Sequence, residues 1–273
     1  MSSSIHSVNT DASSLPLRHP TSVVSPSAKV HSSVRIGPYS VIGEDVEIDE
    51  GCVIGAHVVL TGPMRMGKRC KVYPFASLGE APQDIGYRGE STSLEIGDDN
   101  IIRESVTINR GTLKGGGVTR VGSRNFIMAY CHIGHDCIVG SDNILANNAA
   151  LAGHVEIGDQ VSLGGFTLVH QFCRVGSYAF TGMGTALNQD LAPFVLATGN
   201  YARAIGLNKI GLRRKGFSAD CLEALDRVYR TFLRRRDPNA IALLQQDKDC
   251  YPEVRLMIDF IATSRRGVIR YRP

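Results

Sequence analysis

The chain has 273 residues and a formal net charge of +4, with 43% hydrophobic and 21% charged residues. These values are typical of a soluble globular protein with one large domain or two ordinary ones. The longest apolar runs, such as residues 191–197, are too short to span a bilayer, so we expect no stable membrane insertion.

Residues 1–16 are rich in serine and contain neither a basic cluster nor an apolar core. They therefore have the features of neither a secretory signal nor a transit peptide. We expect them to be a disordered leader, and we expect the protein to be cytoplasmic.

Aliphatic residues recur at every sixth position through most of residues 17–192, apart from two interruptions at residues 80–93 and 112–119. Thr181 is the one exception in this register, so chance spacing does not explain the pattern. The register comprises Val24, Val30, Ile36, Ile42, Ile48, Ile54, Leu60, Met66, Val72, Leu78, Ile96, Ile102, Ile108, Val121, Ile127, Ile133, Val139, Leu145, Leu151, Ile157, Leu163, Val169, Val175 and Leu187.

A second position, four residues after many of these aliphatics, holds a small or modest side chain, as at Cys137 and Ala149. Glycine often follows the aliphatic residue directly, as at Gly37 and Gly134, and we expect it to permit the tight backbone of a corner. Two inward positions in every six residues are typical of a parallel β-helix. Three hexapeptides would form a triangular coil of about 18 residues, and about eight coils would stack.

Two segments interrupt the period, residues 80–93 and residues 112–119, and the second contains three consecutive glycines from Gly115 to Gly117. Long loops that leave a regular solenoid are usually functional. We expect both loops to leave the edges of the prism, where they could reach a neighbouring subunit.

Residues 193–273 have a different pattern, and we expect a small C-terminal α-helical domain. Ser218 is a predicted N-cap for a helix over residues 219–236. A second helix would follow Asp237-Pro238 and run to Leu244, and a third, opened by Pro252, would cover residues 253–263. From residue 200 onward there are 16 Lys+Arg and 8 Asp+Glu, so this part is basic, which predicts either an acidic partner or only a solvated basic helix face. We expect no nucleic acid partner.

The cluster from Cys131 to Cys137, which also contains His132 and His135, raises the possibility of zinc, since Cys and His are its usual ligands. Both cysteines, however, occupy the inward position of the repeat, whereas the histidines do not. An inward and an outward side chain cannot share one ion, so we expect no metal and interpret the cysteines as core residues.

Counting in coils of about 18 residues places outward residues of successive coils in columns. His135, Gly153 and Gln171 fall in one column, and Asp136 and His154 fall in the next. A functional site is therefore predicted on this edge.

A neutral histidine is a suitable general base near pH 7, and an adjacent carboxylate can orient it. There is no nucleophile-elbow motif, which favours direct attack by a substrate hydroxyl over a covalent intermediate. Gly153 could present its backbone N–H to a developing oxyanion.

Several segments resemble the UDP-N-acetylglucosamine O-acyltransferase family of hexapeptide-repeat enzymes, which act at the first step of lipid A biosynthesis. The likeness covers about residues 17–273. It is carried by His19–Thr21, Gln83-Asp84, Ile102–Ile108, His132–Cys137, Leu145–Asn148, Leu151–Val155, His170–Cys173, Gly211–Arg214 and Tyr251–Val254.

The resemblance implies a left-handed β-helix of hexapeptide repeats with a C-terminal helical domain, assembled as a homotrimer with sites between subunits. It implies that His135 deprotonates the glucosamine 3-hydroxyl, which attacks the thioester of a (3R)-hydroxyacyl chain on acyl carrier protein. Asp136 would support His135, and the N–H of Gly153 would serve the oxyanion. No cofactor beyond the carrier's phosphopantetheine arm is implied. The implied substrate-binding residues are Gln83, Asp84, His132, His154, His170, Gln171, Asn208 and Arg214.

The chain departs from the family pattern at four positions. Gly86 stands where a Lys is common, Tyr201 replaces a His, and Ile210 replaces a Glu, so nucleotide contacts are in question. Met183 matches the position that acts as the acyl-chain ruler, where Gly admits the longer chain. We therefore expect a shorter hydroxyacyl chain of about ten carbons; the alternative is that Met183 only fills a widened groove.

Three alternatives use the same scaffold. An N-acyltransferase acting on a 3-amino UDP-sugar would need the same base. A γ-type carbonic anhydrase would need three zinc-binding histidines. A purely structural β-solenoid would tolerate loss of His135.

Overall fold

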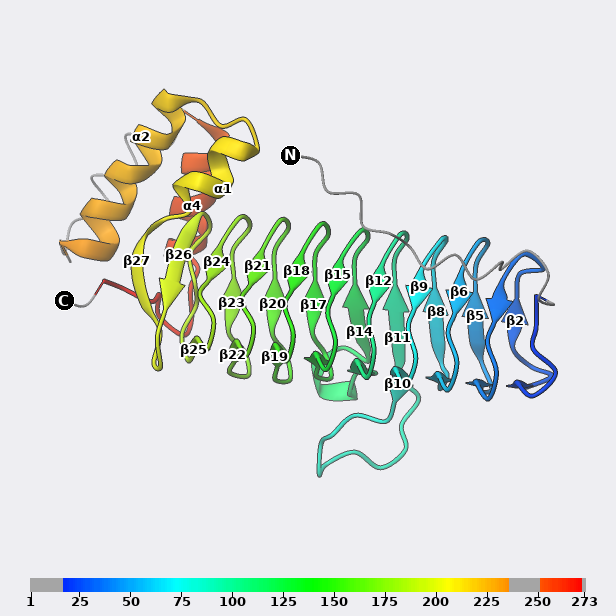
Figure 1. Ribbon diagram of the computed structural model, residues 1–273. Helices are drawn as coiled ribbons and strands as arrows, with labels where there is room; N and C mark the ends of the chain where they lie inside the picture. Colours follow the sequence, from blue (N-terminus) through cyan, green and yellow to red (C-terminus); the bar gives the residue numbers. More distant parts are fainter. Residues whose placement is uncertain (1–16, 236–250, 272–273) are drawn as a thin grey trace.

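The computed structural model describes residues 17–235 and 251–271. The predicted leader over residues 1–16 and the predicted helix after Asp237-Pro238 lie outside these ranges. The described part is a long three-sided prism of stacked coils with a helical cap at one end (Figure 1). None of the described helices is long and apolar enough to cross a membrane.

Three sheets form the sides of the prism, and the chain visits them in turn as a left-handed β-helix, as predicted. Sheet 1 comprises β1 (Val23–Val24), β4 (Val41–Ile42), β7 (Val59–Leu60), β10 (Ser77–Glu80), β13 (Thr107–Asn109), β16 (His132–Ile133), β19 (Ala150–Leu151), β22 (Leu168–Val169) and β25 (Ala186–Leu187). Sheet 2 comprises β2 (Lys29–Val30), β5 (Val46–Ile48), β8 (Met64–Met66), β11 (Ser93–Ile96), β14 (Val118–Val121), β17 (Ile138–Val139), β20 (Glu156–Ile157) and β23 (Arg174–Val175). Sheet 3 comprises β3 (Arg35–Ile36), β6 (Val53–Ile54), β9 (Lys71–Val72), β12 (Ile101–Ile102), β15 (Phe126–Ile127), β18 (Ile144–Leu145), β21 (Ser162–Leu163), β24 (Phe180–Thr181), β26 (Val195–Thr198) and β27 (Arg203–Leu207).

Strand pairing confirms the period. Ile133 pairs with Leu151, which pairs with Val169, so equivalent residues of neighbouring coils are 18 positions apart. Both predicted inward positions are buried: Ile133 and Leu151 have 0% of their surface exposed, and Cys137 also has 0%. Burying one such aliphatic side chain stabilises the fold by about 1.5–3 kcal/mol.

The predicted reason for the repeated glycines is wrong. The left-handed backbone occurs two residues after the glycine, at non-glycine corner residues such as Tyr39 (φ 58°) and His57 (φ 55°). Gly37 is needed instead because a Cβ there would lie 2.7 Å from the carbonyl carbon of Gly55 in the next coil. These glycines therefore allow the backbones of successive coils to approach closely.

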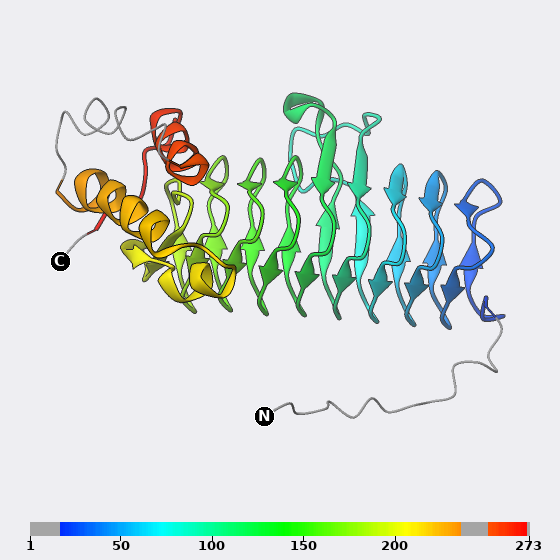
Figure 2. The same cartoon turned by 90° about the horizontal axis from the view of Figure 1, so that it is seen from above.

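Both interruptions of the period leave the prism at the same edge. The first joins β10 to β11, and the second joins β13 to β14, so each lies between sheet 1 and sheet 2. The second includes a short 3₁₀ helix, η1 (Leu113–Gly115). Figure 2 shows both loops projecting from one side of the prism.

β26 lies beyond residue 192 but still extends sheet 3, because it pairs in parallel with β24. The C-terminal cap begins with β27, which pairs with β26 in the antiparallel direction. The helices are α1 (Lys209–Arg214), α2 (Ala219–Val228), a π-helical continuation η2 (Tyr229–Arg234) and α4 (Pro252–Ala262). Ser218 caps α2 as predicted, by accepting a hydrogen bond from the N–H of Cys221. Neither α1 nor β27 was expected from the sequence.

Candidate active site

The corner that joins each strand of sheet 1 to sheet 2 carries the predicted column of histidines, and we call it the histidine edge (residues 134–137, 152–155 and 170–173). The N–H of His154 donates to the carbonyl of His135 in the preceding coil. The ring of His154 stacks on Phe172, with centroids 4.4 Å apart, and meets the ring of His135 edge-on at 5.1 Å. The 18-residue period therefore brings these side chains together as predicted.

Asp136 contacts His135 and is itself held in place by two threonines. Its side chain is completely buried, and its backbone has a left-handed φ of 60°. Oδ2 lies 2.7 Å from Nδ1 of His135 and accepts a hydrogen bond from the Thr112 hydroxyl, while Oδ1 accepts one from the Thr112 N–H. The backbone N–H of Asp136 donates to Oγ1 of Thr119. Because a carboxylate only accepts, it keeps the proton on Nδ1 of His135 and leaves Nε2 free to accept a proton.

Gly153 lies against the ring of His135. A Cβ at Gly153 would be 2.6 Å from Cε1 and 2.7 Å from Nε2 of His135, so no larger residue fits without moving the imidazole. The N–H of Gly153 makes no hydrogen bond to any residue in the described ranges. It is therefore a donor still available to a ligand near His135.

A groove of about 540 Å³ runs from this point along sheet 1. It brings together half of the predicted site residues with the apolar side chains of Ala150 and Leu168, and Tyr201 also lines it. The predicted residues that line it are Gln83, His132, His135, Gly153, His170 and Gln171. An apolar groove with a few convergent polar groups is typical of a small-molecule site.

The two flanking histidines are held largely neutral. Burial lowers the pKa of His132, and His135 lowers it further. Burial also lowers the pKa of His154, although Asp136 acts in the opposite direction. Nδ1 of His132 lies 2.8 Å from Oγ1 of Thr107, which fixes its ring in the groove wall.

Asp84, on the first loop, faces the same histidines. Its Oδ1 accepts a hydrogen bond from the N–H of Gly86 at 2.7 Å, which lowers the pKa of its carboxyl. The charge of Lys114 lowers it further, as do His135 and His154 when their rings are protonated. Asp84 is therefore an ionised acceptor opposite the histidine edge.

The side chains of His135, Asp136 and His154 are close enough together to hold a metal ion. Nδ1 of His135 already bonds to the carboxylate, however, and Thr112 donates to both carboxylate oxygens. This donor set suits a histidine–carboxylate pair better than an open metal site. Cys131 and Cys137 are buried in the interior, so they cannot join the histidines as ligands.

Three predicted residues lie elsewhere on the chain. Met183 follows β24 at the corner between sheets 3 and 1, where 80% of it is exposed. Asn208 caps α1 and donates to the carbonyl of Tyr178, at the corner between sheets 2 and 3, and Arg214 lies at the end of α1. Within one chain, these residues do not reach the histidine edge.

Two residues near the site were not predicted from the sequence: Thr112, whose two hydrogen bonds hold Asp136, and the nearby Lys114. Their position in a glycine-rich interruption of the period was a usable signal, since that interruption ends one coil before His135 on the same edge.

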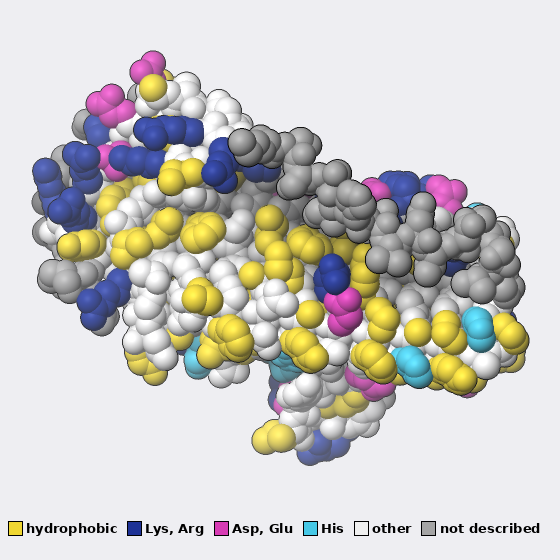
Figure 3. Space-filling view, viewed as in Figure 1, with side chains coloured by type: hydrophobic (Ala, Val, Ile, Leu, Met, Phe, Trp, Pro, Cys, Tyr) yellow, Lys and Arg dark blue, Asp and Glu magenta, His cyan; other side chains and the backbone are white. Residues whose placement is uncertain are grey.

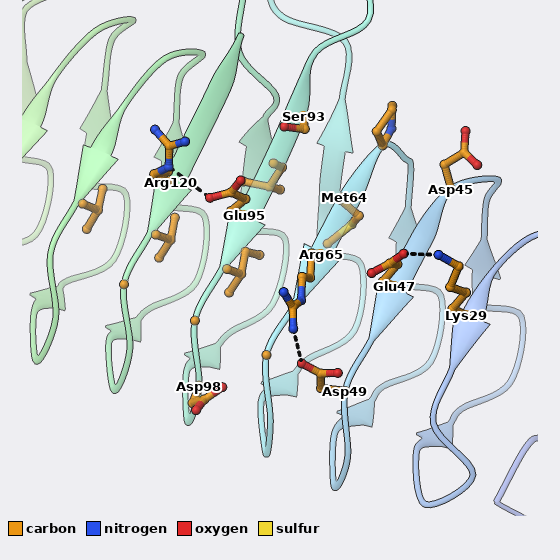
Figure 4. A pocket seen from close by; sticks show the side chains of 18 of the residues that line it. Lys29, Asp45, Glu47, Asp49, Met64, Arg65, Ser93, Glu95, Asp98 and Arg120 are labelled. Atoms are coloured by element: carbon orange, nitrogen blue, oxygen red, sulfur yellow. Dashed lines mark hydrogen bonds and ion pairs between the residues drawn. The ribbon is translucent and has the colours of Figure 1, made fainter. Parts of the chain in front are cut away.

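A second cavity, about 840 Å³, lies on the outer face of sheet 2 (Figure 4). Its charged side chains are paired with one another across neighbouring strands, as Arg120 is with Glu95 at 3.0 Å and Arg65 with Asp49 at 3.4 Å. No histidine or cysteine is among the described residues that line it. The chemistry therefore favours the smaller groove as the active site.

Comparison with known proteins gives concordant matches over both parts of the chain. Residues 190–269 match the family described as Udp N-acetylglucosamine O-acyltransferase, Domain 2, and residues 27–62 and 119–153 match the bacterial transferase hexapeptide repeat. The acyl-[acyl-carrier-protein]--UDP-N-acetylglucosamine O-acyltransferase of Halorhodospira halophila is 52% identical over 255 residues, covering 92% of this chain and 98% of the relative. The corresponding enzyme of Thiobacillus denitrificans is 53% identical over 254 residues, with the same coverage.

Solved structures agree. The crystal structure of UDP-N-acetylglucosamine O-acyltransferase from Moraxella catarrhalis superimposes with a TM-score of 0.91 at 44% identity, covering 93% of this chain and 100% of that one. Such identity over nearly the full length of both chains extends through the histidine edge and the helical cap alike. The chain therefore belongs to the UDP-N-acetylglucosamine O-acyltransferase family of enzymes.

Proposed function

We propose that this enzyme transfers a (3R)-hydroxyacyl chain from acyl carrier protein to the 3-hydroxyl of UDP-N-acetylglucosamine, the first step of lipid A biosynthesis. The observation that carries the proposal is the buried Asp136 bonded to Nδ1 of His135, whose ring lies against Gly153 in the groove. Family membership supports the substrates, because the relatives are named for both of them. We expect the reaction to occur in the cytoplasm.

In the proposed mechanism, Nε2 of His135 accepts the proton of the sugar hydroxyl as its oxygen attacks the thioester carbon. The carbonyl oxygen becomes an oxyanion, to which the free N–H of Gly153 donates. The negative charge of Asp136 stabilises the imidazolium that forms. The C–S bond then breaks, and His135 returns its proton to the leaving thiolate, so no covalent enzyme intermediate and no further cofactor are required.

We propose that a homotrimer completes the site. Met183, Asn208 and Arg214 lie on the two edges away from His135, so one chain alone does not gather all the predicted binding residues. The outer faces of sheets 3 and 1 carry exposed apolar side chains, such as Ile144 (42%) and Leu168 (53%), while that of sheet 2 carries paired charges. Contact between neighbours through sheets 3 and 1 would bring the Met183 edge of one chain toward the groove of another.

The helical cap is the proposed docking surface for acyl carrier protein. Lys and Arg side chains gather over the C-terminal helices (Figure 3). Arg230 is paired with Asp226 at 2.6 Å, whereas Arg213 and Arg214 at the end of α1 have no ion pair among the described residues. An unpaired basic surface suits an acidic protein partner.

The purified enzyme can be assayed with UDP-N-acetylglucosamine and hydroxyacyl carrier proteins, and the product identified by mass. An O-acylated sugar nucleotide is expected from the wild-type protein. Absence of transfer to this acceptor, with transfer to the 3-amino analogue, would contradict the proposal and favour an N-acyltransferase.

A further inference from the structure

Lys114 is a charged residue beside the groove to which the proposed mechanism gives no role. It belongs to η1, which is fixed directly over the catalytic pair. Thr112 donates two hydrogen bonds to the Asp136 carboxylate, and a Cβ at Gly115 would lie only 2.1 Å from the carboxyl carbon of Asp136. The backbone on both sides of Lys114 is therefore positioned by the residue that orients His135.

The ammonium group of Lys114 reaches across to the first loop. A Cβ at Gly86 would lie 3.0 Å from Nζ of Lys114 and 3.2 Å from Oδ1 of Asp84. Because Gly86 has no side chain, it leaves room for the ammonium group of Lys114. Because Lys114, His135 and His154 together lower the pKa of Asp84, the ammonium group shares the electrostatic surroundings of the histidine edge.

Among the described residues, Lys114 makes no close contact with an acidic group, although its charge lowers the pKa of the Asp84 carboxyl. Within residues 17–235 and 251–271, its side chain forms neither a hydrogen bond nor an ion pair within 4 Å. By contrast, Arg110 and Arg88 on the neighbouring segments donate to backbone carbonyls. An ammonium group that lies between two loops without a direct ion pair attracts anions, and lysine is a common point-charge ligand of phosphate.

We infer that Lys114 binds a phosphate group of a substrate and fixes that substrate at the His135 end of the groove. The inference rests on the proposed function, under which both substrates carry phosphate: the diphosphate of the sugar nucleotide and the phosphodiester of the pantetheine arm. Asp84 remains available to substrate hydroxyls, since only Oδ1 accepts a hydrogen bond within the described residues. Gly86 and Lys114 thereby act together, one by leaving space and the other by supplying charge.

The test uses the full-length protein with Lys114→Ala and Lys114→Arg, and with Lys29→Ala as a control on the distant charged face of sheet 2. The Kd of UDP-N-acetylglucosamine is measured by calorimetry without carrier protein, and KM for acyl carrier protein is measured in the transfer assay. Loss of a charge-assisted phosphate contact in Lys114→Ala is expected to raise one of these constants about tenfold. Lys114→Arg is expected to stay within about threefold of wild type, because it retains the charge.

The two measurements identify the source of the phosphate. A raised Kd for the sugar nucleotide would show that Lys114 contacts its diphosphate. A raised KM for the carrier protein alone would show that Lys114 contacts the phosphodiester of the pantetheine arm. The effect is expected to shrink as salt rises, because the interaction is screened. If both constants in Lys114→Ala stay within about twofold of wild type, as in Lys29→Ala, the inference is wrong. A wild-type protein that binds the nucleotide but transfers no acyl group would refute the proposed function and leave the Kd comparison intact.

Discussion

Nδ1 of His135 lies 2.7 Å from Oδ2 of Asp136, although the two residues are adjacent in the sequence. In a continuous strand, neighbouring side chains point to opposite faces. The left-handed φ of Asp136 breaks that alternation at the corner and turns both side chains toward each other. The corner of the β-helix, rather than any separate loop, therefore builds the catalytic pair.

Replacing His135 by Ala or Gln is expected to lower kcat by about 10²–10⁴-fold, because no other side chain in the groove has both a free acceptor nitrogen and a buried carboxylate behind it. The measurement is steady-state acyl transfer, with circular dichroism to verify the fold. His31→Ala, on an exposed corner near the start of the helix, is the control and should retain activity. A His135 variant with near-normal kcat would leave the structural-solenoid interpretation standing.

Asp136→Asn is expected to lower both activity and stability. The amide removes the negative charge beside the imidazolium, and its NH₂ group must face the Nδ1–H of His135 or a donor of Thr112. We expect kcat to fall at least about tenfold and the free energy of unfolding to fall by about 1–3 kcal/mol, the cost of an unsatisfied buried group. Chemical denaturation of wild type and variant checks the second effect. Unchanged kcat would exclude an electrostatic role for this carboxylate.

Gly153→Ala is expected to abolish most activity while leaving binding of the sugar nucleotide measurable. The new Cβ would lie 2.6 Å from Cε1 of His135, so the imidazole must move out of line with its substrate. Gly206→Ala is a matched control, since a Cβ at Gly206 meets nothing within 4 Å. Similar kcat values for the two alanine variants would show that the position of the His135 ring does not limit the reaction.

Much of this site could be predicted from the periodic part of the sequence. The six-residue register separates inward Cys137 from outward His135, and counting by coils aligns His135 with Gly153. These steps succeed because every coil repeats one backbone geometry, so sequence distance converts directly into spatial position.

The predictions fail where that repetition ends. Thr112 reaches Asp136 from an insertion of no fixed geometry, and α1 belongs to the cap. The register could also have placed Met183, two residues after Thr181, on another edge. The resemblance alone grouped it with the groove residues.

Met183→Gly is expected to shift acyl preference toward longer chains. Met183 is 80% exposed in one chain, and in the proposed trimer its side chain would close the end of a neighbour's groove. Wild type should prefer 3-hydroxydecanoyl over 3-hydroxymyristoyl carrier protein, and the variant should reverse or equalise kcat/KM for the two donors. A clear wild-type preference for the longer chain would show that Met183 is not a ruler.

Because His132 and His154 are half-buried, we expect the protein to lose stability in mild acid. Burial lowers the pKa of His132 and His154 from the ordinary value of 6.5, so the unfolded chain binds their protons at a higher pH than the folded protein does. Their contribution to the free energy of unfolding is complete above pH 6.5 and is lost as the pH falls toward the pKa values of the folded protein. It amounts to about 1.4 kcal/mol for each unit by which folding lowers a pKa. Urea unfolding at pH 8 and 5.5 measures the loss.

Surface carboxylates titrate mainly below this pH interval, since the ordinary pKa values of Asp and Glu are 3.8 and 4.5. His132→Gln, which cannot be protonated, is expected to lose less stability than wild type over the same interval, and an equal loss in both proteins would exclude His132 as a source.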